Sequence, residues 1–212
     1  MITIQVDTHP FDNELKLYSR KQFTFEPGLT SLVGCNGSGK STLIDYYLKP
    51  YLDKQKIAVI QYNYRRSGGT HLMDAMLNSG DMSTLADMAF ASEGERIIFG
   101  LNPIFGMLKS IFPQHKNQQV FVILDACDSG MSIDEIAQIK ETFLDVVIPD
   151  AKEAYNVELY IVVAANNYEW CNDSRIHNMD ITSGKSLNII SSYDEYRQII
   201  LKSRKLKDKL RS

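Results

Sequence analysis

The sequence predicts an α/β fold, with a largely parallel sheet flanked by helices and an antiparallel β portion at the N-terminus. Short, almost continuous apolar runs, which are typical of strands buried on both faces, alternate with segments whose apolar residues recur at helical spacing. This alternation favours parallel strands joined by helices. The chain has 212 residues, 44% of them hydrophobic, and shows no linker or internal repeat, so we expect a single domain over residues 1–212.

The N-terminal part is expected to form the antiparallel strands. The runs ITIQV at residues 2–6 and LKLYSRKQFTF at residues 15–25 partly alternate polar and apolar residues, as strands with one exposed face do. After the turn EPG, the apolar run LTSLVG predicts a buried strand that leads into a glycine-rich loop and a helix ending near Pro50. A further buried strand is expected at residues 56–62 (KIAVIQY).

The second half of the chain continues the alternation. A helix is expected at about residues 70–77, and another begins after Ser92, a residue type that caps helix N-termini and is followed here by acidic residues in the first turn. Apolar runs predict buried strands at residues 118–126 and 157–167. Between them, residues 132–155 have the spacing of one or two helices.

Charge is low overall but concentrated at the C-terminus. The net charge of -3 argues against a generally basic nucleic-acid-binding surface. Residues 201–212 nevertheless form a basic tail, which could contact nucleic-acid phosphates or could simply be a solvated helix. Its basic residues are Lys202, Arg204, Lys205, Lys207, Lys209 and Arg211.

Cysteine usage and hydropathy bear on the compartment. The three cysteines form no CxxC pair, so we expect neither a disulfide framework nor a zinc site. No apolar run reaches the roughly 18 residues of a membrane span, and the N-terminus lacks the features of a signal peptide. We therefore expect a cytoplasmic protein without a membrane partner.

One motif indicates nucleotide chemistry. The stretch GCNGSGKS matches the phosphate-binding loop GxxxxGK[ST] at every fixed position, between a predicted strand and a predicted helix. Its backbone N–H groups would bind phosphate, Lys40 would reach the outer phosphates, and the Ser41 hydroxyl would bind Mg²⁺. The loop alone does not identify a reaction. The candidate phosphate-binding residues are Gly34, Asn36, Gly37, Ser38, Gly39, Lys40, Ser41 and Thr42.

Around this loop the chain resembles the ABC-type P-loop ATPases. The stretch FEPGLTSLVGCNGSGKSTLI is most similar to their soluble chromosome-maintenance and RecF-like branch, here without the long coiled coil. The resemblance implies ATP and Mg²⁺ as ligands, with Gln61 and Asp125 joining Ser41 at the metal. It also implies that ASEGER is a degenerate signature, in which Ser92 and Gly94 would bind the phosphate of a partner subunit and make an ATP-dependent homodimer.

The sequence departs from this family where catalysis is decided. Ala126 occupies the place of the usual glutamate, so Asp128 is the nearest substitute, although it could instead be a loop or N-cap acid. Asn166, at the tip of a predicted strand, could orient the attacking water, as Gln61 would in the family. The strings LDACDSGMS and NNYE, at residues 166–169, also resemble small stand-alone ATP-binding proteins of phages and bacteria. We expect slow hydrolysis.

Three functional classes follow. The first is a dimeric ATPase in nucleic-acid metabolism or genome defence, and the second is a nucleotide-dependent switch that binds a protein partner. A transporter subunit is less favoured, because the segment between Gln61 and the signature is too short to receive a membrane partner. Tyr18 and Phe23 could stack on adenine or could belong to the sheet.

Overall fold

The computed structural model describes most of the chain. The expected helix at residues 70–77 and the predicted cap Ser92 lie outside the described residues. The described residues are 1–11, 16–63, 93–128 and 131–211.

Six strands form the central sheet of the described part, in the order β4-β5-β6-β3-β7-β8. All neighbouring pairs are parallel except β7 with β8, which confirms the expected largely parallel sheet. The strands are β3 (Gly28–Val33), β4 (Ala58–Asn63), β5 (Gln119–Asp125), β6 (Glu158–Ala164), β7 (Ile176–Asp180) and β8 (Lys185–Ser186).

The N-terminal antiparallel pair is also present, but shorter than expected. Strand β1 (Ile2–Gln5) pairs with β2 (Gln22–Phe25). The strand predicted from residue 15 begins only at Gln22, because the consecutive residues Leu17 and Tyr18 are both buried, which the alternation of a strand with one exposed face does not allow. Tyr18 and Phe23 are fully buried, so neither ring is available to stack on adenine.

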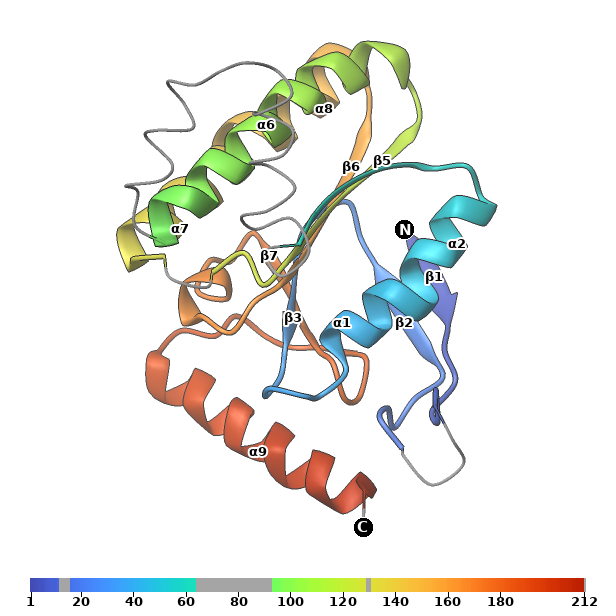
Figure 1. Ribbon diagram of the computed structural model, residues 1–212, viewed down its shortest axis with the longest axis vertical. Helices are drawn as coiled ribbons and strands as arrows, with labels where there is room; N and C mark the ends of the chain where they lie inside the picture. Colours follow the sequence, from blue (N-terminus) through green and yellow to red (C-terminus); the bar gives the residue numbers. More distant parts are fainter. Residues whose placement is uncertain (12–15, 64–92, 129–130, 212) are drawn as a thin grey trace.

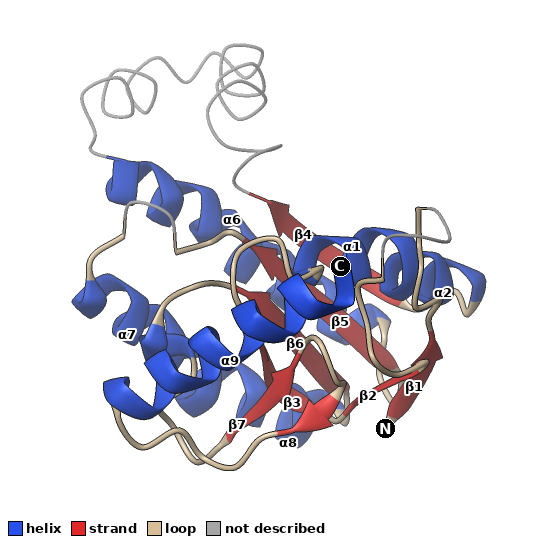
Figure 2. Ribbon diagram, turned by 90° about the horizontal axis from the view of Figure 1, so that it is seen from below, coloured by secondary structure: helices blue, strands red, loops and turns tan. Residues whose placement is uncertain are grey.

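Helices cover both faces of the sheet (Figure 1). One core lies between the sheet and α6, α7 and α8, and the other lies between the sheet, α1, α2 and the β1–β2 pair. Helix α9 crosses the edge where the parallel strands end (Figures 1 and 2). The helices are α1 (Lys40–Leu43), α2 (Lys49–Lys54), α6 (Glu93–Gln114), α7 (Ile133–Glu141), α8 (Ile148–Tyr155) and α9 (Tyr193–Arg211), with π-helical turns η1 (Ile44–Leu48) and η2 (Thr142–Val147).

The helix predicted to end near Pro50 continues to Lys54. Proline lacks an N–H donor, and its ring clashes with the carbonyl four residues earlier in an α-helix. The wider π turn η1 ends two residues before Pro50 and accommodates the ring, and η2 ends two residues before Pro149 in the same way. Both helices therefore pass their prolines without ending.

The structure also describes the state of the cysteines and the apolarity of the helices. All three cysteines are buried and free, and burial raises the pKa of the Cys171 thiol to about 11. None of the described helices combines the length and the apolarity that crossing a bilayer requires.

Candidate functional site

A polar pocket of about 410 Å³ opens where β3 and β5 end and α1 begins. The phosphate-loop sequence forms one wall, and its turn requires left-handed backbone at Gly37 (φ 72°) and Gly39 (φ 101°), which glycine adopts without strain. The first N–H groups of α1 have no partner within the helix and face this end of the loop. The lining residues are Phe11, Leu17, Asn36, Gly37, Ser38, Gly39, Lys40, Ser41, Thr42, Asp125, Ala126, Ala164 and Asn166.

Lys40 supplies the cation of the pocket. Its side chain is only 8% exposed, and Nζ donates to the Gly34 carbonyl at 2.7 Å and to Asn166 Oδ1 at 2.8 Å. Burial lowers the pKa of Lys40, and the carboxylates of Asp128 and Asp125 offset part of that shift. The negative charge of a phosphate group here would stabilise the charged form of Lys40, which burial disfavours.

Ser41 and Asp125 meet at the other side of the pocket. The Ser41 hydroxyl donates to Asp125 Oδ1 at 3.1 Å, and Asp125 is 5% exposed at the end of β5. A hydroxyl and a carboxylate are the hard oxygen ligands that Mg²⁺ prefers, so this donor set fits that ion. The buried Ser38 hydroxyl nearby has no hydrogen-bond partner within the described residues.

The sheet order brings a third strand into the site. Strand β6 lies between β3 and β5, so Asn166, two residues beyond β6, reaches the space between them. Its side-chain oxygen accepts from Lys40, and its backbone N–H donates to Asp128 Oδ2 at 2.7 Å. Asp128 itself does not line the pocket. It therefore reaches the phosphate-loop lysine through Asn166.

Ala126 occupies a left-handed conformation directly after Asp125. Its φ is 55°, which costs a non-glycine residue on the order of 1–3 kcal/mol, and its N–H donates to the Ala164 carbonyl at 3.0 Å. The left-handed residue turns the chain away from β5 at the pocket wall. Among the described residues that line the pocket, Asp125 is the only one with a carboxylate.

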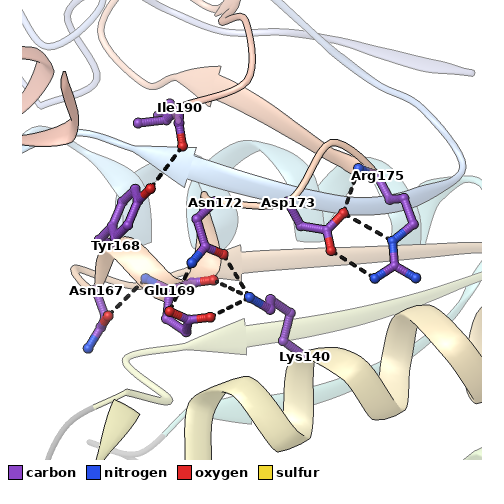
Figure 3. A network of polar contacts seen from close by, with 8 residues as sticks. All are labelled: Lys140, Asn167, Tyr168, Glu169, Asn172, Asp173, Arg175 and Ile190. Carbon is purple, nitrogen blue, oxygen red and sulfur yellow. Dashed lines mark hydrogen bonds and ion pairs between the residues drawn. The ribbon is translucent and has the colours of Figure 1, made fainter. Parts of the chain in front are cut away.

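The loop that carries Asn166 is anchored from behind by a buried ion pair (Figure 3). Lys140 of α7 is 5% exposed, and its Nζ donates to Glu169 Oε1 at 2.5 Å and to Asn172 Oδ1 at 2.7 Å. Asn167 accepts from the Glu169 N–H at 2.9 Å. The Glu169 carboxylate, part of the NNYE string, thus pairs with Lys140 and does not line the pocket.

The remaining predicted site residues are placed elsewhere or not described. Gln61 lies in β4 in register with Ile123, and it does not line the pocket. Gly94 is in the first turn of α6, which begins at Glu93 as the sequence predicts. Ser92 lies outside the described residues.

Two aromatic residues, Phe11 and Tyr18, contact the pocket or its loop in ways that the sequence does not indicate. Phe11 lines the pocket with its ring 53% exposed, edge-to-face with Tyr46 at a centroid distance of 5.5 Å. Tyr18 donates to the Gly39 carbonyl at 2.8 Å, and burial raises the pKa of its hydroxyl, so it stays a donor. Neither position has a local pattern that distinguishes it from a sheet or loop aromatic.

Helix α9 also touches the phosphate loop, which the sequence does not predict. The Cys35 N–H donates to Ser203 Oγ at 3.2 Å, and Lys207 Nζ donates to the Asn36 carbonyl at 3.4 Å. Gly34 allows this approach, because a Cβ there would lie 2.3 Å from Ile181 Cγ2 and 3.3 Å from Ser203 Oγ. The conformation of the loop therefore depends on a helix near the end of the chain.

The structure thus gathers predicted residues from three separate segments of the chain. Comparison with protein-family models, curated proteins and solved structures found no match for this chain. Function is therefore inferred from the chemistry of the site itself. The predicted residues that lie together, directly or through one another, are Lys40, Ser41, Asp125, Asp128 and Asn166.

Proposed function

We propose that this protein is an ATP-binding protein and a slow ATPase of the ABC-type P-loop class. The observation that carries the proposal is the convergence of Lys40, Ser41 and Asp125 on one pocket beside a loop with the phosphate-binding sequence. A lysine, a hydroxyl with a carboxylate, and the first backbone N–H groups of α1, which have no partner within the helix, together suit a magnesium-bound polyphosphate.

Each part of the pocket has a role in this proposal. The Ser41 hydroxyl and the Asp125 carboxylate would hold Mg²⁺, which when bound neutralises phosphate charge. Lys40 would exchange its protein acceptors for outer phosphate oxygens. The exposed ring of Phe11 offers an apolar surface for the base at the pocket mouth. The resemblance also assigns Gln61 to the metal and the water.

Hydrolysis is proposed to be slow because no carboxylate besides Asp125 lines the described pocket. Asn166 can orient a water molecule but, as an amide, cannot accept its proton as a base. Asp128 accepts from the Asn166 N–H and acts by positioning Asn166, in addition to any direct part as the proton acceptor. Lys40, Mg²⁺ and the loop backbone still stabilise the transferring phosphoryl group, so turnover falls while binding persists.

The same observation favours a second candidate, a nucleotide-dependent protein-binding switch with little or no hydrolysis. In either case we propose that ATP drives formation of a homodimer, with Ser92 and Gly94 of one subunit near the phosphate bound by its partner. A nucleic-acid or protein partner would then bind the dimer in preference to the monomer. Turnover separates the candidates: an Asp128→Asn protein that loses hydrolysis but retains partner binding is a switch.

The test is calorimetric titration with Mg-ATP. Lys40→Ala should abolish measurable binding, whereas Lys54→Ala, which removes an exposed lysine at the end of α2, should bind as the wild type does. Circular dichroism of both variants should match the wild type. Wild-type affinity in Lys40→Ala would disprove the proposed site, and mass measured with and without ATP tests the dimer.

A further inference from the structure

Helix α9 carries two arginines on one side, beside the nucleotide pocket. Arg197 and Arg204 are seven residues apart, which is two helical turns, so they lie on nearly the same side of α9. Both line a second cavity of about 270 Å³, whose opposite wall includes Asn36 and Asn166. These two asparagines also line the nucleotide pocket, so the two cavities adjoin.

The two arginines are available to a ligand. Within the described part of the chain, neither guanidinium has an ion-pair or hydrogen-bond partner, in contrast to Arg175, which pairs with Asp173 and Asp145. Both arginines are exposed along the helix. A pair of unpaired guanidinium groups favours a ligand with repeated phosphate groups, since each group can bind phosphate through two parallel hydrogen bonds.

An aromatic cluster completes this surface. Tyr193 lines the same cavity, its ring is 63% exposed, and its neighbours Tyr168 and Tyr196 lie at centroid distances of 6.1 and 6.4 Å. Tyr196 is 7% exposed and fixes the cluster against the protein. The Tyr193 ring is therefore in contact with two other rings while most of its surface stays exposed to a planar partner.

We propose that Tyr193, Arg197 and Arg204 form a binding surface for single-stranded nucleic acid. The arginines bind phosphodiesters and Tyr193 stacks on a base, the combination by which proteins hold single strands. Seven helical residues span about 10.5 Å, roughly the rise of three stacked nucleotides at 3.4 Å each. A duplex keeps its bases stacked inside and offers Tyr193 no partner, so the surface favours single strands.

The inference goes beyond the proposed nucleotide binding, because strand binding is assigned to Tyr193, Arg197 and Arg204, none of which belongs to the phosphate loop. Lys40→Ala should therefore lose Mg-ATP and keep the single strand. A protein that binds the strand but never ATP would contradict the proposed function alone, and one that binds ATP but not the strand would contradict this inference alone.

The test is fluorescence anisotropy with a labelled oligothymidylate of about 12 nucleotides, within the ~4–16-nucleotide range of single-strand sites. Arg197→Gln/Arg204→Gln should weaken binding by roughly tenfold or more and reduce the salt slope by about 1.4, since each single-strand phosphate contact contributes ~0.7. Tyr193→Leu should weaken binding at least about fivefold with the slope unchanged, because stacking is not ionic.

The matched control is Lys202→Gln/Lys205→Gln, which removes the same charge from two exposed lysines that do not line the cavity. It should keep the wild-type affinity and slope, and thermal melting should show that all variants fold. The inference is overturned if the wild type does not bind, or if both double variants lose affinity equally. Equal affinity for a duplex, or full displacement by polyglutamate with no effect of Tyr193→Leu, would also overturn it and indicate a general polyanion or acidic-protein surface.

Discussion

Glu169→Gln should destabilise the protein by about 3 kcal/mol, because it leaves a buried ammonium group without its counter-charge. The side chain of Glu169 is 16% exposed and that of its partner Lys140 only 7%. Removing one member of a buried ion pair costs about 3–5 kcal/mol. The lower end applies here, since the Glu169 carbonyl and Asn172 Oδ1 still accept from Lys140, at 3.1 and 2.7 Å.

The assay is urea unfolding followed by circular dichroism, and the control is Asp145→Asn. Asp145 pairs with Arg175 at the surface, where the two side chains are 55% and 49% exposed, so its loss should cost no more than about 1 kcal/mol. Glu169 also lies three residues after Asn166, so Glu169→Gln should weaken Mg-ATP binding while Asp145→Asn should not. If the two variants unfold at the same urea concentration, the ion pair does not hold this loop.

The other predictions concern the loop, its lysine and the second acid. Gly34→Ala should destabilise the protein by about 1–3 kcal/mol through overpacking against Ile181. The control Gly106→Ala, where a Cβ meets nothing within 4 Å, should stabilise helix α6 by up to ~1 kcal/mol. Equal melting temperatures of the two variants would contradict the close approach of Gly34 to Ile181. Binding of Mg-ATP should be accompanied by proton uptake at Lys40 as the pH rises through the lowered pKa of that lysine, since phosphate favours its charged form and raises the pKa again. Calorimetry in two buffers of different ionisation enthalpy measures the uptake. Its absence would place Lys40 away from phosphate. Asp128→Asn should keep ATP binding but lower turnover by ~100-fold or more, and wild-type turnover would remove Asp128 from the mechanism.

Much of the sheet could be predicted because its strands are buried on both faces. Strands β5 and β6 are nearly continuous apolar runs, and each appears where the sequence predicts it. Strand β7 was not predicted, because its sequence IHNMD is mixed in polarity; it forms through pairing with β3, and the buried Asn178 donates to the Cys171 carbonyl. The pairing with β3 joins segments that are far apart in the sequence, so the local pattern does not predict it.

Parts of the site can likewise be predicted from the sequence, and other parts cannot. The phosphate loop is a local motif, so its residues can be identified from eight consecutive letters. The contact of Lys40 with Asn166 instead depends on β6 inserting between β3 and β5, and strand order is not written in any one strand. The contact of Cys35 with Ser203 joins residues 168 positions apart. A basic run such as that of α9 gives no sign of which side packs on the protein.

Under the proposed function, the acids of this site would favour retention of nucleotide over its rapid hydrolysis. Asp125 accepts from Ser41 and is committed to the metal side of the pocket, while Asp128 accepts from the Asn166 backbone and holds the residue that contacts Lys40. The intervening Ala126 has no side-chain group to accept a proton, and its left-handed turn directs the chain away from β5. The pocket therefore has the groups that the proposed Mg-ATP binding needs but lacks the usual base, so slow hydrolysis would lengthen the lifetime of the proposed bound state. In the proposed homodimer, a long-lived ATP-bound state would give a single strand time to bind the α9 surfaces of both subunits.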